Sequence, residues 1–266
     1  MTVPLPARLL IATTNPGKLD EIRGILGAVP VTLVTLADHS PGPEPEETGS
    51  TFAENARLKA RYYAGATGEL TVAEDSGLEI DALDGEPGVH SARFNGESYA
   101  EKFATIQEML AERGTDSSTA RFVCALTLAV RGARPTAFDR RCIPPDGGAP
   151  KADTAGIFPR RALSDRRTSG LCATRDVHHG LPARTDGIVW ETTGIVEGRV
   201  RLPPRGNGGF GYDPIFYYPA YGRTLAEVTA EEKAAVSHRG QAFRALGAYF
   251  GKWLDGSGPS SPPWAL

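Results

Sequence analysis

The chain has 266 residues, of which 40% are hydrophobic and 23% are charged, and its formal net charge at pH 7 is −3. This is a typical globular composition; no segment approaches the roughly 20 apolar residues that a membrane span requires, and a net negative chain disfavours binding to a nucleic-acid backbone. The three cysteines show no paired spacing, so the sequence favours neither disulfides nor a zinc site. The start of the sequence has no basic segment followed by an apolar run. Together these features predict a cytoplasmic protein without a membrane or nucleic-acid partner.

Hydrophobic periodicity predicts alternating strands and helices in the first half of the chain. Strands are expected at residues 8–12, 31–36, 70–73 and 78–83, and helices at residues 18–26, 51–64 and 99–113. Ser50 or Thr51 would cap the second helix, because a hydroxyl at this position accepts a hydrogen bond from a free backbone N–H. Glu74 and Asp75 would lie in a turn between two short strands, facing a cleft.

The second half shows the strongest strand pattern of the chain, at residues 120–130. Residues 188–200 predict two strands around Thr193-Gly194, and residues 225–249 predict one or two helices. Alternating strands and helices are typical of an α/β architecture with helices packed against a sheet.

Residues 131–187 break this pattern, with 11 Lys and Arg against 6 Asp and Glu and no sustained apolar period. Too few apolar residues are present to offset the entropy of ordering them. We therefore expect one domain over residues 1–254, interrupted by a disordered insertion at about residues 135–184 and followed by a flexible tail at residues 255–266. A basic arm that binds nucleic acid, with salt-sensitive affinity, is the alternative.

The segment 13–18, Thr-Thr-Asn-Pro-Gly-Lys, joins a predicted strand to a predicted helix. Its N–H groups, hydroxyls and lysine would converge on an anion at the helix N-terminus. A Walker A loop is excluded, because that motif needs Gly in place of Ala12 and Ser or Thr in place of Leu19. An ordinary capped turn remains the alternative for this segment alone.

Carboxylates at Glu46, Glu47, Glu74 and Asp75 are the hard oxygen ligands that Mg²⁺ prefers when it also binds substrate phosphates. A carboxylate at a strand end would also accept a proton from an attacking water. Carboxylates in loops are, however, often only solvated.

Two later segments favour recognition of a flat base. Residues 208–214, Gly-Gly-Phe-Gly-Tyr-Asp-Pro, combine a flexible backbone with two aromatic rings for stacking and an acid, Asp213, for the base edge. His238 and Arg239 follow a predicted helix and would donate hydrogen bonds to a base carbonyl or a phosphate. The alternatives are a tight turn with core aromatics and a solvated helix end.

Taken in chain order, these segments resemble the inosine triphosphate pyrophosphatase family, the Ham1-like or RdgB-like enzymes. The matching motifs lie at residues 13–18, 47–60, 75–78, 87–93, 209–216 and 232–240, within residues 8–130 and 188–250. The family joins the two strands that match residues 120–130 and 188–200 by a short hairpin, so residues 135–184 depart from its pattern. Both Pro145-Asp146-Gly147 and Thr185-Asp186-Gly187 resemble that hairpin turn.

The resemblance implies an α/β fold in which an elongated central mixed sheet is flanked by helices, with a nucleotide cleft between two lobes. It also implies a homodimer that hydrolyses ITP, dITP and XTP to the monophosphate and pyrophosphate. Asp75 and Lys59 would be catalytic, and Glu47 and Asp75 would hold Mg²⁺. The substrate would be bound by Thr13, Thr14, Asn15, Pro16, Gly17, Lys18, Asn55, Ser76, Arg93, Phe210, Gly211, Tyr212, Asp213, Lys233, His238 and Arg239.

Two other functions remain open from the sequence. One is a pyrophosphatase for other modified nucleotides, as in the Maf-like proteins of similar fold. The other is a nucleotide-binding protein without turnover, for which the acid at position 75 or the lysines would be expected to be missing. Both are present here.

Overall fold

The computed structural model describes residues 8–27, 29–40, 42–132, 187–254 and 257. All of them belong to one of the two compact units of the chain, which comprises residues 1–133 and 185–266. The insertion predicted at residues 135–184 and almost all of the tail predicted at residues 255–266 lie outside the described residues.

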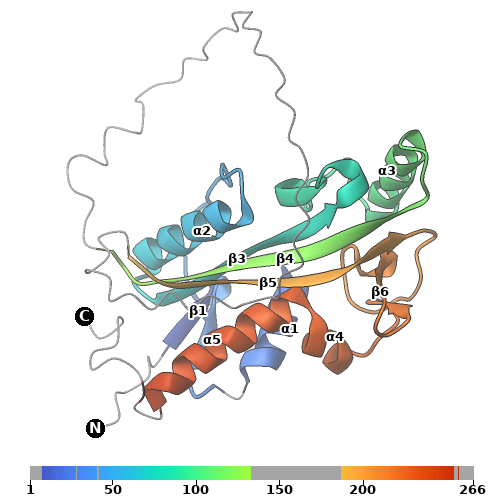
Figure 1. The fold of residues 1–266 in the computed structure, drawn as a ribbon. Coiled ribbons are helices and arrows are strands. Elements are labelled where there is room, and N and C mark those ends of the chain that lie inside the picture. Colours follow the sequence, from blue (N-terminus) through green and yellow to red (C-terminus); the bar gives the residue numbers. More distant parts are fainter. Residues whose placement is uncertain (1–7, 28, 41, 133–186, 255–256, 258–266) are drawn as a thin grey trace, which may run out of the picture. The chain divides into compact units, whose positions relative to one another are not determined.

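Seven strands form one mixed sheet in the order β2-β1-β3-β4-β5-β6-β7 (Figure 1). The strands are β1 (Arg8–Ile11), β2 (Thr32–Thr35), β3 (Leu70–Ile80), β4 (Ser117–Ala129), β5 (Ile188–Arg201), β6 (Phe216–Tyr218) and β7 (Arg223–Thr224). β1 pairs in parallel with β2 and β3, and all later pairs are antiparallel. This sheet with its flanking helices confirms the predicted α/β class.

Five α-helices accompany the sheet in the described part of the chain: α1 (Pro16–Leu26), α2 (Phe52–Thr67), α3 (Tyr99–Glu112), α4 (Ala230–Val236) and α5 (His238–Leu254). Thr51 caps α2, accepting from the N–H of Glu54, whose carboxylate accepts from the N–H of Thr51 in return. The predicted helices at residues 18–26, 51–64 and 99–113 are therefore confirmed within a few residues.

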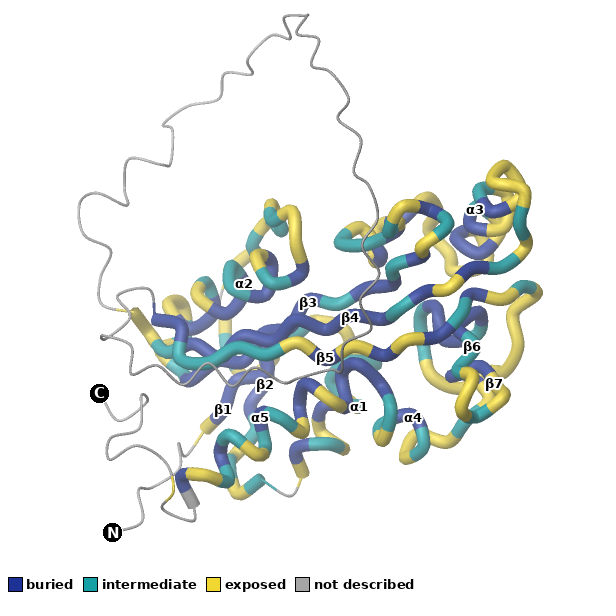
Figure 2. Tube along the Cα trace, viewed as in Figure 1, coloured by how far each residue is buried: buried dark blue, intermediate teal, exposed yellow. Residues whose placement is uncertain are grey.

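Helices cover both faces of the sheet because successive strand residues point to opposite sides. On β1, Leu9 and Ile11 pack in one cluster with apolar residues of α1 and α5. Leu10, between them, packs with residues of α2 on the other face. Figure 2 shows β3 and β4 largely buried along the middle of this arrangement, whereas β5 is mostly intermediate or exposed; other exposed residues lie on the outer surfaces of the helices and in loops.

The prediction of two short strands around an acidic turn at residues 74–77 is wrong. β3 runs unbroken through this segment, pairing Glu74 with Leu126, Asp75 with Ala125 and Ser76 with Cys124. The long apolar strand β4 supplies backbone partners from Thr71 to Ile80 of β3, and this pairing overrides the local preference for a turn.

The prediction of two strands around Thr193-Gly194 is also wrong, because β5 is continuous. A Cβ atom at Gly194 would collide with the carbonyl oxygen of His238, at the start of α5. Glycine at this position thus permits close packing of a helix against the strand, as elsewhere in sheets. It brings the first residues of α5 next to the sheet.

No helix among the described segments has the length and apolar character that crossing a membrane requires.

Candidate active site

The loop between β1 and α1 presents the N-terminus of a helix. Asn15 caps α1, with its Oδ1 accepting from the N–H of Lys18 at 3.1 Å, and Pro16 occupies the first turn. The Oγ1 of Thr13 accepts from the N–H of Asn15 at 3.2 Å, and Thr14 is exposed. The predicted capped strand-to-helix turn is confirmed, and its position at a helix N-terminus suits an anion.

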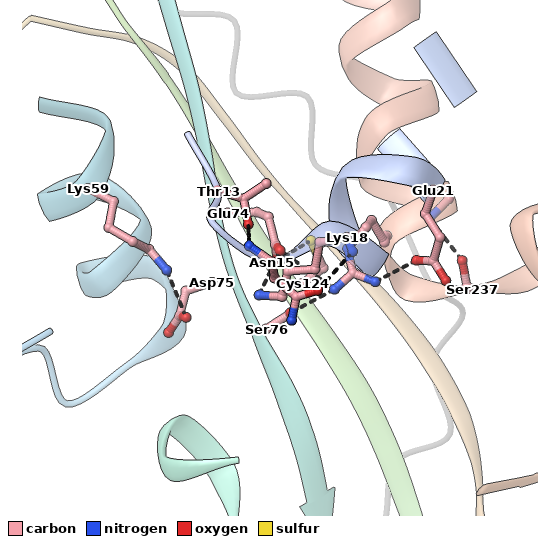
Figure 3. Close-up of polar contacts among 12 residues, drawn as sticks. Thr13, Asn15, Lys18, Glu21, Lys59, Glu74, Asp75, Ser76, Cys124 and Ser237 are labelled. Carbon is pink, nitrogen blue, oxygen red and sulfur yellow. Dashed lines mark hydrogen bonds and ion pairs between the residues drawn. The ribbon is translucent and has the colours of Figure 1, made fainter. Parts of the chain in front are cut away.

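β3 divides the acidic segment between the two faces of the sheet. Asp75 faces α2, whereas Glu74 and Ser76 face α1 and α5, as Figure 3 shows for their polar contacts with Lys59 and Lys18. The cause is the two-residue period of a strand. The predicted strand-end position of these acids is therefore wrong. Asp75 and Ser76 nevertheless place polar side chains on opposite faces of one strand.

On the α2 face, the Nζ atom of Lys59 lies 3.0 Å from Asp75 Oδ1 and 2.8 Å from Glu47 Oε1. Asn55 donates from Nδ2 to Asp75 Oδ2 at 3.1 Å. Burial raises the pKa of Asp75 above its ordinary value, despite the opposing effect of Lys59. Arg93, 59% exposed, reaches Glu47 from the outside at 3.6 Å. Three predicted site residues, Lys59, Asn55 and Arg93, thus contact the predicted carboxylate pair of Glu47 and Asp75.

The donor set of this cluster fits a magnesium ion that also binds substrate phosphates. Mg²⁺ usually uses one or two protein carboxylates and fills its other positions with phosphate oxygens and water. Glu47 and Asp75 supply two carboxylates, held together by one lysine. Among the described residues no group of three or more His, Cys, Asp or Glu side chains forms a cage of its own. Glu74, a predicted oxygen ligand, points to the opposite face, and Glu46 is exposed.

On the α1 and α5 face, Glu74 is buried between two cations. Its Oε1 lies 2.7 Å from the Nζ of Lys18 and 3.5 Å from the Nη2 of Arg239. Burial alone would raise the pKa of Glu74, but the two cations outweigh it and hold the pKa well below the ordinary range. Arg239 also donates to Ser76 Oγ at 3.0 Å. Glu74 is therefore ionised and forms ion pairs with both Lys18 and Arg239.

Glu21, which the sequence analysis did not single out, extends this charged network. Its carboxylate lies 2.6 Å from Lys233 Nζ and 2.6 Å from Arg239 Nη1. Lys233 in turn contacts Asp213 Oδ2, which also accepts from the N–H of Phe210 at 2.8 Å. Burial raises the pKa of Asp213, against the effect of Lys233. Glu21 follows Lys18 by three residues on one face of α1, a spacing that could have identified it.

His238 and Arg239 are buried at the start of α5, which rules out the alternative of a solvated helix end. The His238 ring stacks on Phe122 at a centroid distance of 4.8 Å. Burial, with Arg239 beside it, keeps the pKa of His238 well below its ordinary value, so the ring is neutral. Within the part of the chain that the structure describes, His238 Nδ1 and Arg239 Nε have no hydrogen-bond partner. Buried polar atoms of this kind normally have partners, which suggests a bound ligand supplies them.

The two aromatic rings of the glycine-rich turn have different environments. Phe210 is half-buried, with its ring over the ammonium of Lys233 at 4.6 Å and the guanidinium of Arg239 at 5.4 Å. Tyr212 is only 4% exposed and packs edge-on against Tyr99, and its hydroxyl donates to the carbonyl of Ser91 at 2.8 Å. Phe210 is thus available for stacking on a base. Tyr212 is instead largely a core aromatic residue, which was the alternative expected from the sequence.

One cavity is lined by most of the residues that were predicted to bind the substrate. Its predicted lining residues are Asn15, Lys18, Ser76, Phe210, Gly211, Tyr212, Asp213, Lys233, His238 and Arg239. Ser91, Tyr99 and Phe122 also line it and were not predicted, because sheet and helix packing brings them there. The predicted residues outside this lining are Thr13, Thr14, Pro16, Gly17, Glu47, Asn55, Lys59, Asp75 and Arg93. Of these, the α2-face cluster is joined to the cavity through consecutive residues of β3, Asp75 and Ser76.

Fold and site together define an α/β protein with a cationic, aromatic-lined cavity beside a carboxylate pair. A model of the Ham1 family matches residues 9–143 and 161–249. A relative from Exiguobacterium sibiricum named dITP/XTP pyrophosphatase is 38% identical over 243 residues, which cover 91% of this chain and 96% of the relative. One of the same name from Thermus thermophilus is 39% identical over 240 residues, covering 90% and 89%.

Solved structures agree. A HAM1 protein from Coxiella burnetii matches with a TM-score of 0.66 and 31% identity, covering 92% of this chain and 98% of that one. The Ham1 protein of Staphylococcus aureus matches with a TM-score of 0.63 and 28% identity, covering 94% and 100%. The chain belongs to the Ham1 family, as the sequence motifs predicted.

Proposed function

We propose that this protein is a nucleoside triphosphate pyrophosphohydrolase that cleaves deaminated purine nucleotides (ITP, dITP and XTP) to the monophosphate and pyrophosphate, with Mg²⁺ as cofactor. The observation that carries the proposal is the arrangement about β3. Asp75 faces a carboxylate and lysine cluster suited to phosphate chemistry, while Ser76 faces a cavity with an aromatic ring and unpaired buried donors. Relatives that match about nine-tenths of the chain, 91% and 90%, carry the name dITP/XTP pyrophosphatase.

The phosphate end of the substrate would lie at the N-terminus of α1 and beside β3. The Lys18 ammonium and the positive end of the α1 helix dipole supply positive charge there. Enzymes of this family use a divalent metal ion, and Mg²⁺ bound by Glu47 and Asp75 would neutralise phosphate charge. Asp75, with its raised pKa, is placed to accept the proton of the attacking water, and Lys59 orients its carboxylate.

The base end would enter the cavity beneath Phe210. Inosine and xanthine carry a carbonyl at position 6, where adenine carries an amino group. The Arg239 Nε–H, and His238 in the tautomer with its proton on Nδ1, would donate to that carbonyl and be left unpaired by ATP, which costs roughly 1–3 kcal/mol per buried group. Guanine shares the carbonyl, so its exclusion requires a further contact.

The test is release of pyrophosphate from ITP, dITP, XTP, GTP, ATP and dUTP in the presence of Mg²⁺, by the intact chain and by Asp75→Asn. Fast release from ITP, dITP and XTP, slow release from ATP and GTP, and loss of turnover in the variant are expected. Preference for dUTP or another modified pyrimidine would instead support the Maf-like alternative. Nucleotide binding without any release would indicate a non-catalytic protein.

Two further properties are expected, the first from the family resemblance and the second from the cysteine pattern and the start of the sequence. We propose that the protein acts as a homodimer and that it acts in the cytoplasm. Sedimentation equilibrium of the full chain tests the first, and fractionation of the source cells tests the second.

A further inference from the structure

Glu74 lies at the junction of two groups that line the cavity but does not line the cavity itself. Its side chain is 2% exposed, and its Oε1 contacts Lys18 from α1 and Arg239 from α5 (Figure 3 shows the carboxylate beside Lys18). Its other oxygen, Oε2, is 3.6 Å from the thiol sulfur of Cys124 on β4. The carboxylate therefore joins three separate elements through β3.

The two cations held by Glu74 face different parts of a ligand. Lys18 belongs to the first turn of α1, next to the cap residue Asn15, and would face phosphate. Arg239 lies under Phe210, its Nε has no hydrogen-bond partner in the described ranges, and it would face the base. Whatever fixes the distance between these two cations also fixes the distance between base and phosphate recognition.

The dependence of the two cations on Glu74 is unequal. Arg239 has a second anchor, because its Nη1 lies 2.6 Å from Glu21. Lys18 has no second acidic partner among the residues that the structure describes. Without the Glu74 charge, Lys18 would lose the one acidic partner that it has among the described residues, while Arg239 would keep its contact with Glu21.

We propose that Glu74 is a positioning residue that holds the Lys18 ammonium and the Arg239 guanidinium on one buried carboxylate, so that the base and the triphosphate bind in a fixed register. The inference rests on the proposed function, since it assigns the two cations to the two ends of one nucleotide. It differs from a role in metal binding, because Glu74 points away from the Glu47 and Asp75 pair.

The variant Glu74→Gln removes the charge but keeps the shape. It leaves the site with one more net positive charge and frees the Lys18 ammonium from its carboxylate. Inorganic tripolyphosphate has no base and needs no fixed register, so the freed Lys18 can follow it, and it should inhibit as well as before or more tightly. ITP needs both ends in register, so its kcat/KM should fall by about 10-fold. A purely structural role would weaken both ligands together.

The experiment measures kcat/KM for ITP and the inhibition constant of tripolyphosphate, both with Mg²⁺, in the intact chain, Glu74→Gln and Glu74→Asp. Glu79→Gln is the matched control: Glu79 lies on the same strand, partly exposed and 3.5 Å from Arg121, and should behave as the unaltered protein. Thermal unfolding checks that each variant is folded. Glu74→Asp keeps the charge but has a shorter side chain, so kcat/KM for ITP should fall by about 3-fold while tripolyphosphate inhibition is kept. This variant provides the test if Glu74→Gln does not fold.

A selective loss for ITP in the Glu74 variants supports the proposal. Equal losses for ITP and tripolyphosphate, or wild-type values for both in a folded Glu74 variant, would overturn it. The intact chain separates this result from the proposed function: failure of the unaltered protein to release pyrophosphate from ITP refutes the function itself, whereas wild-type behaviour of the Glu74 variants in an active enzyme refutes only the positioning role.

Discussion

Gly17→Ala should separate base recognition from folding. Gly17 lies in the first turn of α1, and a Cβ atom there would be 2.9 Å from Cδ1 and 3.1 Å from Cγ of Phe210. Carbon atoms pack best at about 3.5–4.0 Å, so the ring would have to move by about 0.6 Å or more. Phe210 is a half-buried aromatic ring in the cavity lining, and in the proposed function this shift would displace the surface on which the base stacks.

The expected magnitude follows from the value of a stacked base. A base on an aromatic side chain contributes about 1–3 kcal/mol, so partial loss of this contact should lower kcat/KM for ITP by about 3- to 30-fold, chiefly through KM. Alanine in the helix should favour folding by up to about 1 kcal/mol relative to glycine, which offsets the cost of moving the ring. The free energy of unfolding should therefore change by less than about 1 kcal/mol.

The same helix offers a control in Gly24, which is exposed, and a Cβ atom there would have no other atom within 4 Å. Gly24→Ala should stabilise the protein by about 0.5–1 kcal/mol and leave kcat/KM unchanged. Pyrophosphate release and urea denaturation measure both quantities for each variant. Wild-type kinetics in Gly17→Ala, or equal kinetic losses in both variants, would refute the assignment of Phe210 to the base.

Three further outcomes are expected. Asp75→Asn should lower kcat by at least about 100-fold in the pyrophosphate assay, because the proton acceptor is lost; retained turnover would exclude Asp75 from that role. Lys233→Met should lower the free energy of unfolding in urea by about 3 kcal/mol, since it leaves the Glu21 and Asp213 carboxylates without their shared cation; a stable variant would contradict this. His238 is neutral when folded, whereas in the unfolded chain it binds a proton below its ordinary pKa of 6.5, so stability should fall as the pH drops through that value. Between about pH 7.5 and 5.5 the free energy of unfolding of the intact protein should fall by about 1 kcal/mol more than that of His238→Gln. Equal losses in the two proteins would show that His238 does not cause the pH dependence.

Much of the site is predictable because its residues act through local backbone chemistry. The Asn15 cap, the Thr51 cap and the glycine-rich turn before Asp213 follow from side chains that bond to their own backbone neighbours, and the structure contains each of them. Glu21 was missed because an acid on an amphipathic helix is most often solvated. Only the packing of α1 against α4 and α5 turns it toward Lys233 and Arg239.

The sequence by itself determined the alternation of helices and strands, the family and the set of polar residues that would meet. Tertiary structure alone decided how they are divided. Pairing with β4 makes β3 one continuous strand, and its two-residue period then sends Asp75 to the α2 face and Glu74 to the α1 and α5 face. Strand register depends on a partner more than 40 residues away in the sequence, so adjacent acids that look equivalent along the chain take separate roles only in the folded sheet.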